Sequence, residues 1–124
     1  MATPLHRVRH YGSAHEGTNH FWRQRLTGAA NAILVVCLIG VLLSLVGAPY
    51  GPAAAVVGSP FVAALLVLLF VSAGIHMRLG MQTIVEDYIH TEGLKVVLLV
   101  ASTFFTVAVA AVAILAVVKL AVGA

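Results

Sequence analysis

Charged residues are scarce in this chain of 124 residues, where they make up 9% of the sequence. An average soluble domain has roughly 25%. Hydrophobic residues make up 61%, and this balance excludes an ordinary soluble domain and places the chain in a membrane. We therefore interpret the formal net charge of +3 as a sign of membrane orientation and not of nucleic-acid binding.

Cysteine is almost absent as well. Cys37 is the single cysteine, so an intrachain disulfide is excluded, and its place in an apolar stretch is typical of a small buried hydrophobe. The histidines near the amino terminus are scattered among Gly, Ser and Thr without the spacing of a metal site; they are His6, His10, His15 and His20. We interpret this polar tail as a segment on the membrane surface or against a soluble partner, ending in the interfacial aromatics Phe21 and Trp22.

What the chain does have is three long apolar stretches, Leu26–Ala48, Ala53–Ile75 and Val96–Val118, the second of which continues through His76 toward Ile84. Each is longer than the ~20 residues that a membrane-spanning helix requires. The first is too long for the core of a cleavable signal peptide, which has roughly 7 to 15 apolar residues. The sequence predicts an all-α integral membrane protein with one domain over 1–124, a polar tail over about 1–24, and transmembrane helices over about 25–48, 59–86 and 93–120.

Charge is distributed unevenly between the two sides of these spans. The loop 49–60 has no charged residue, whereas cations gather before the first span and around the second loop; they are Arg7, Arg9, Arg23, Arg25, Arg78 and Lys95. Cations favour the cytoplasmic side, so we expect the amino terminus and the second loop to be cytoplasmic, or matrix-facing in an organelle. Lys119 can reach the opposite interface by extending its side chain. The absence of an Arg- and Ser-rich leader favours a bacterial inner membrane over a mitochondrial one.

His76 is the only histidine inside the apolar stretches. Ionisable groups at membrane depth are costly and usually face a protein interior. On one helix the neighbouring positions on its face are small, polar or acidic, namely Ser72, Ala73, Gly80, Thr83 and Asp87, and Asp87 lies about 16 Å along the axis from His76. Two interpretations stay open: a hydrogen bond across helices with the small residues serving packing, or axial ligation of a haem. One histidine supplies half of a bis-histidine site, so the second interpretation predicts a partner chain.

Asp87 and Tyr88 lie where apolar sequence gives way to charge. They can be an interfacial charge and an aromatic-belt residue, or part of a quinone site in which the tyrosine hydroxyl donates to a quinone carbonyl and the carboxylate orients it or passes protons. His90, close by, can relay protons or be a solvated loop histidine. Asn31 is an isolated polar residue in the first span, for which we expect an interhelical hydrogen bond.

The stretch HMRLGMQTIVEDY over His76–Tyr88 resembles the His, Gly-Met, Asp-Tyr signature of the smaller hydrophobic anchor subunit, the D-type chain, of succinate dehydrogenase, which is respiratory complex II. The stretch FWRQRLT over Phe21–Thr27 also resembles that family, as do the length and the three spans. The resemblance covers about the whole chain, although these two stretches carry its specificity.

The resemblance implies a single membrane-anchor domain that forms half of a haem-binding helical bundle, completed by a second anchor chain. In that family a flavoprotein oxidises succinate, and an iron-sulfur subunit passes electrons to ubiquinone at a site shared with the anchors. Residue by residue, His76 matches the ligand of haem b, Tyr88 the tyrosine that hydrogen-bonds quinone, and Asp87 its neighbouring carboxylate. Arg25 matches an arginine near the haem propionates, with Arg23 close enough to take that place.

The resulting prediction is a non-catalytic anchor subunit, since nothing in the sequence binds flavin or activates a dicarboxylate. The anchor of a quinol:fumarate reductase is an alternative with the same chemistry in reverse. A small transporter or channel subunit is an alternative of another class, but it would be expected to carry a charged group within a span. Glu86 and Asp87 lie at the edge instead, and no Gly-Pro break interrupts a span.

Overall fold

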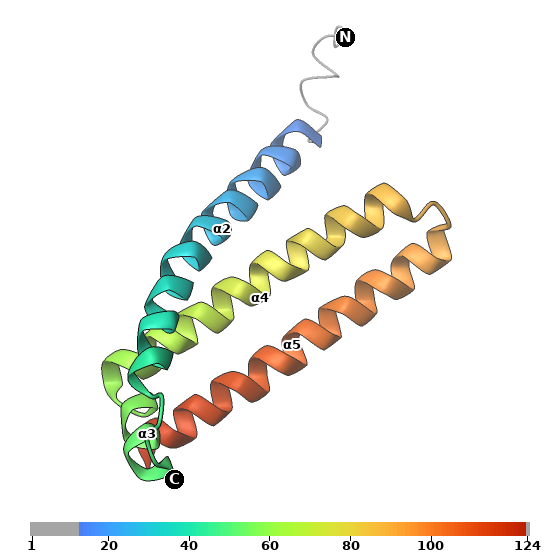
Figure 1. Ribbon diagram of the computed structural model, residues 1–124. Helices are drawn as coiled ribbons and strands as arrows, with labels where there is room; N and C mark the ends of the chain where they lie inside the picture. The colour runs from blue at the N-terminus through green and yellow to red at the C-terminus, as the bar shows by residue number, and fades with distance from the viewer. Residues whose placement is uncertain (1–12, 124) are drawn as a thin grey trace, which may run out of the picture.

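The computed structural model describes residues 13–123 and is helical throughout, with no strand in that range. Its helices are α2 (Ser13–Ser44), α3 (Tyr50–Val57), α4 (Pro60–Tyr88) and α5 (Glu92–Val122) (Figure 1). Three segments are long and apolar enough to cross a membrane: Thr18–Ser44, Pro60–Tyr88 and Glu92–Val122. The predicted all-α fold with three membrane spans is therefore confirmed. The tail residues His6, Arg7, Arg9 and His10 lie outside the described part.

Helix α2 differs from the helix that hydropathy predicted. It begins at Ser13 and ends at Ser44, whereas the prediction ran over about 25–48. No proline occurs between these two residues, and polar side chains such as Gln24 are compatible with a helix, so the spanning helix continues into the polar sequence. It ends before predicted because a turn follows, in which Gly47 has φ of 76°, a left-handed conformation that favours glycine.

The connection between α2 and α4 is itself mostly helical. Helix α3 occupies most of the segment between the first two predicted spans. Helix α4 then begins close to the predicted residue 59, with Ser59 at its N-cap and Pro60 in its first turn. Between them, a Cβ on Gly58 would lie 2.6 Å from the backbone oxygen of Leu120. This turn can approach the carboxyl end of α5 so closely because residue 58 is a glycine.

Helix α4 lies between α2 and α5 and packs against both, while α2 and α5 make no close contact with each other. Ala63, Leu66 and Val117 form the buried core, which lies toward the end of the molecule where α3 packs on α4 and α5. In Figure 1, α2 and α4 meet near that end and diverge toward the start of α2 and the end of α4. The core thus holds one end together, and the opposite end is open between α2 and α4.

Candidate functional site between α2 and α4

The half-buried His76 lies on α4 and faces α2. Its ring atom Nδ1 is 3.1 Å from the hydroxyl oxygen Oγ1 of Thr27 on α2. A Cβ on the neighbouring Gly28 would lie only 3.3 Å from Cε1 of the same ring. The imidazole therefore packs against the backbone of α2, and a hydrogen bond joins it to that helix.

Two of the small and polar residues that share the predicted face with His76 pack against α2. The Ser72 hydroxyl donates to the backbone oxygen of Thr27 at 3.3 Å, and a Cβ on Gly80 would lie 3.6 Å from Nε2 of Gln24. Another side of α4 carries Gly74, which faces α5. The prediction that this row of residues is a packing face is therefore confirmed for Ser72 and Gly80.

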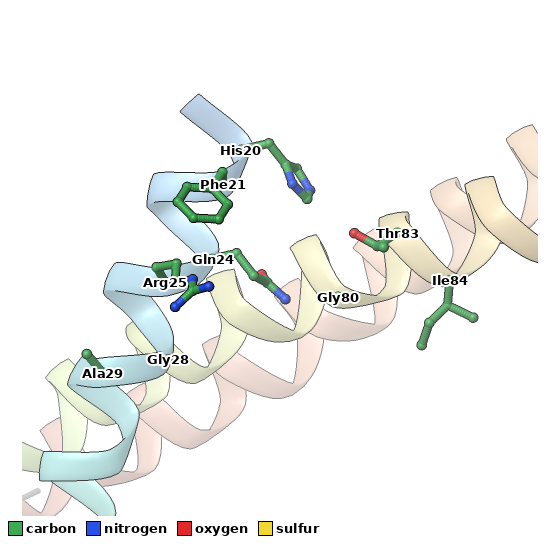
Figure 2. A pocket seen from close by; sticks show the side chains of 9 residues that line it. All are labelled: His20, Phe21, Gln24, Arg25, Gly28, Ala29, Gly80, Thr83 and Ile84. Carbon is green, nitrogen blue, oxygen red and sulfur yellow. The ribbon is translucent and has the colours of Figure 1, made fainter. Parts of the chain in front are cut away.

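A pocket of about 660 Å³ lies between α2 and α4 at the open end of the molecule (Figure 2). Its lining residues are His20, Phe21, Gln24, Arg25, Gly28 and Ala29 from α2, and Gly80, Thr83 and Ile84 from α4. Gly28, at which an added Cβ would lie against the His76 ring, belongs to this wall. None of the lining residues comes from α5, so the pocket lies on the side of α4 that α5 leaves uncovered.

The two arginines near the start of the first span lie on different sides of the α2–α4 contact. Arg25 lines the 660 Å³ pocket, and its guanidinium carbon lies 4.9 Å from the centroid of the Phe21 ring, a cation–π distance. Arg23 instead lines a smaller pocket of about 250 Å³ together with Arg78. Arg78 also lies beside α5 residues. Arg25, and not Arg23, therefore shares a pocket with the glycine that contacts His76.

Three buried polar atoms on α2 have no hydrogen-bond partner among residues 18–123: Nε2 of His20, Oε1 of Gln24 and Oδ1 of Asn31. The interhelical hydrogen bond expected of Asn31 is thus not made through this oxygen. Buried polar groups are normally paired. His20 and Gln24 line the pocket, so this wall offers one nitrogen and one oxygen to a polar group of a ligand or another chain.

Asp87 and Tyr88 are the last two residues of α4 and are not brought together with His76. Both are exposed, Tyr88 to 76%, and neither lines the pocket between α2 and α4. Tyr88 follows His76 by twelve positions, which corresponds to about 18 Å along a helix. Glu86 accepts a hydrogen bond from Gln82 at 3.0 Å, and His90 is exposed just beyond the helix end. A haem ligand and a quinone contact on this helix would therefore belong to two separate sites.

Several residues that build this site on α2 were not predicted as site residues from the sequence. His20, Gln24, Thr27 and Gly28 form one row of α2 that faces α4 or the pocket. Their spacing of four, three and one residues is that of a single helical face, and it was available as a signal. It was missed because the polar members precede the apolar stretch and the two parts were interpreted as different elements.

Among the described residues, no group of three or more His, Cys, Asp or Glu side chains is close enough to hold a metal ion. Cys37 is exposed on α2 and unpaired, not buried within the chain as expected.

The three spans and the pocket between α2 and α4 define a multi-pass helical membrane protein with a polar site between two spans.

Comparison with known proteins identifies the family. Residues 1–117 match the family of succinate dehydrogenase/fumarate reductase transmembrane subunits. Over 123 residues the chain is 32% identical to the succinate dehydrogenase hydrophobic membrane anchor subunit of Paracoccus denitrificans, covering 98% of this chain and 94% of that protein. No solved structure matches the chain significantly. The chain belongs to this family and is one of its membrane anchor subunits.

Proposed function

We propose that this chain anchors a flavoprotein and an iron-sulfur subunit of a succinate:quinone oxidoreductase to the membrane, supplies one axial ligand to a haem b, and forms part of the ubiquinone site. The observation that carries the proposal is His76, which is held by Thr27 between α2 and α4 beside a pocket with glycines in both walls. The relative's name, succinate dehydrogenase, favours this direction of the reaction over fumarate reduction. Membership of the family argues against the transporter alternative.

The residues around the pocket fit a haem. A neutral imidazole is a common axial ligand, and Gly28 and Gly80 leave room for a flat macrocycle to approach the two helices. Arg25 at the same pocket can pair with a propionate, because a guanidinium binds carboxylates through two parallel hydrogen bonds. The unpaired atoms of His20 and Gln24 add polar contacts on this wall. When bound, the haem would accept and release one electron.

A second anchor chain completes this proposal. Two histidines occur in the three candidate spans of the described chain. His20 lies at the edge of the first span, so only His76 lies well inside one. The pocket lies on the side of α4 that α5 does not cover. A second chain at that side would supply the other axial ligand and close the pocket.

We place the quinone contact at the carboxyl end of α4. The Tyr88 hydroxyl there would donate a hydrogen bond to a quinone carbonyl, and the Asp87 carboxylate would orient that hydroxyl or carry protons from water. Because both side chains are exposed in this chain, the remaining walls of the quinone site would come from the iron-sulfur subunit and the second anchor.

The same end of the molecule fits the cytoplasmic side of a bacterial inner membrane. The start of α2, the end of α4 and the start of α5 all lie at that end of the molecule (Figure 1), and Arg23, Arg25 and Lys95 lie near it along their helices. This distribution agrees with the preference of cations for the cytoplasmic side. The flavoprotein and iron-sulfur subunits would bind on that side.

The proposal is tested by purifying the tagged chain from its native host in mild detergent. We expect a flavoprotein, an iron-sulfur protein and a second small membrane chain to co-purify, and the dithionite-reduced minus oxidised spectrum to show a b-type haem. A colourless preparation without these partners would contradict the proposal.

Replacing Tyr88 by phenylalanine should lower quinone reduction while leaving the haem spectrum unchanged. The change deletes one hydrogen-bond donor, which is worth about 0.5–1.5 kcal/mol and corresponds to a decrease of about 2- to 13-fold in kcat/KM for quinone. Tyr50→Phe is the matched control, because it removes the same hydroxyl from another exposed tyrosine in α3. Equal quinone kinetics in the two variants would show that Tyr88 acts only as an interfacial aromatic.

A further inference from the structure

The hydroxyl group of Thr27 lies within hydrogen-bond distance of three atoms at once. Its oxygen lies 2.7 Å from the backbone oxygen of Arg23, 3.3 Å from that of Gln24, and 3.1 Å from Nδ1 of His76. A hydroxyl has one hydrogen to donate, and a backbone carbonyl can only accept. The hydrogen is therefore donated to a backbone oxygen of α2. Because its contact is the shorter one, the acceptor is the backbone oxygen of Arg23. Toward His76, the Thr27 oxygen is left as an acceptor.

This assignment fixes the hydrogen on the imidazole. If the Thr27 oxygen accepts, Nδ1 must carry the hydrogen, and in the neutral ring Nε2 then carries the free lone pair. Within the described chain, Nε2 of His76 has no hydrogen-bond partner that would compete for that lone pair. We infer that Thr27 is a positioning residue that holds His76 in the Nδ1–H tautomer and thereby presents Nε2 to the haem iron.

Two further contacts restrict the orientation of the pair. Ser72, one turn before His76 on α4, donates to the backbone oxygen of Thr27 at 3.3 Å, which ties the two helices together at this level. Gly28 brings the α2 backbone against the edge of the ring at Cε1. The tautomer and the tilt of the imidazole are thus set by α2, although the ligand itself belongs to α4.

The consequence for the metal follows from the proposed haem ligation, on which this inference rests. A hydrogen bond from the non-ligating nitrogen makes the imidazole a stronger base toward the metal. A stronger base stabilises ferric haem more than ferrous haem and lowers the midpoint potential. Removing the acceptor from Thr27 should therefore raise the potential and weaken the retention of haem.

The test compares Thr27→Val with Thr27→Ser in the intact complex. Valine keeps the shape of threonine without the hydroxyl, whereas serine keeps the hydroxyl. We expect Thr27→Val to retain haem about tenfold more weakly, as is typical when the partner of a ligating histidine is lost, with a more positive midpoint potential and altered g-values of the ferric haem. Thr27→Ser should resemble the parent in all three measurements. If the valine variant does not assemble, Thr27→Ala removes the hydroxyl without branching at Cβ.

His76→Ala, measured alongside, separates the two hypotheses. In one outcome, His76→Ala changes the haem content or spectrum while Thr27→Val and Thr27→Ser both match the parent. In that case Thr27 serves only packing and this inference is wrong, but the proposed ligation by His76 stands. If His76→Ala leaves the haem spectrum, the g-values and the potential unchanged, His76 is no ligand and both fail. A loss of complex yield in Thr27→Val with unaltered properties of the remaining haem also overturns the inference.

Discussion

Replacing His76 by alanine is expected to remove most of the haem from the purified complex, or to convert it to a five-coordinate form with a shifted spectrum. The expected loss of haem affinity is at least about tenfold, since even the hydrogen-bond partners of ligating residues contribute 10- to 100-fold. The complex should still assemble, because the buried core of Ala63, Leu66 and Val117 lies away from this histidine. The measurements are the haem-to-flavin ratio and the reduced minus oxidised spectrum.

His90→Ala is the matched control for this experiment. His90 is exposed in the loop after α4, so its loss removes an imidazole without touching the space between α2 and α4. Its haem content and spectrum should equal those of the parent complex. If His76→Ala and His90→Ala gave the same haem content and the same spectrum, the ligand would have to come from other chains.

The loss of His76 should affect stability much less than it affects haem. The ring contributes one hydrogen bond between α2 and α4, to Thr27, and such bonds between membrane helices are worth about 0.6 kcal/mol on average. The Ser72 bond to the Thr27 backbone and the contact of Gly80 with Gln24 remain. Haem content and complex yield can therefore be measured as separate properties.

The sequence alone predicted the features of the fold that depend on composition. Lipid requires long apolar helices, so the three spans follow from hydropathy, and Pro60 marks the start of α4 because a helix tolerates proline in its first turn. The extension of α2 back to Ser13 was not predictable in this way, because a polar helix at a membrane surface leaves no signal in hydropathy. The position of α4 between α2 and α5 was also not predictable, because it depends on packing between apolar faces of similar composition.

The candidate site was predictable on α4 but not across to α2. The histidine and the small residues beside it stand out against an apolar background, so helical geometry alone identified the face. The contact between Thr27 and His76 joins residues 49 positions apart, and a single sequence carries no signal for such a pair. Arg23 and Arg25 are two positions apart, which corresponds to about 200° around a helix, so they must lie on different sides of α2; the sequence did not specify which of them shares the pocket with Gly28.

Replacing Gly28 by leucine is expected to abolish haem binding without unfolding the chain. Even a Cβ at this position would lie 3.3 Å from Cε1 of His76, and the rest of a leucine would enter the pocket or push the imidazole away from its position. Leucine is a better helix former than glycine by several tenths of a kcal/mol to about 1 kcal/mol, so α2 itself should not be weakened. Haem content should fall by at least about tenfold, comparable to the loss of a ligand's hydrogen-bond partner.

Gly40→Leu supplies the comparison within the same helix. A Cβ on Gly40 would meet no atom of the described chain within 4 Å, so this variant gains the same helix propensity without filling the site. It should retain haem, and both variants should yield similar amounts of folded chain by circular dichroism in detergent. A Gly28→Leu complex with a full complement of haem and an unshifted spectrum would mean that the macrocycle does not lie against this part of α2.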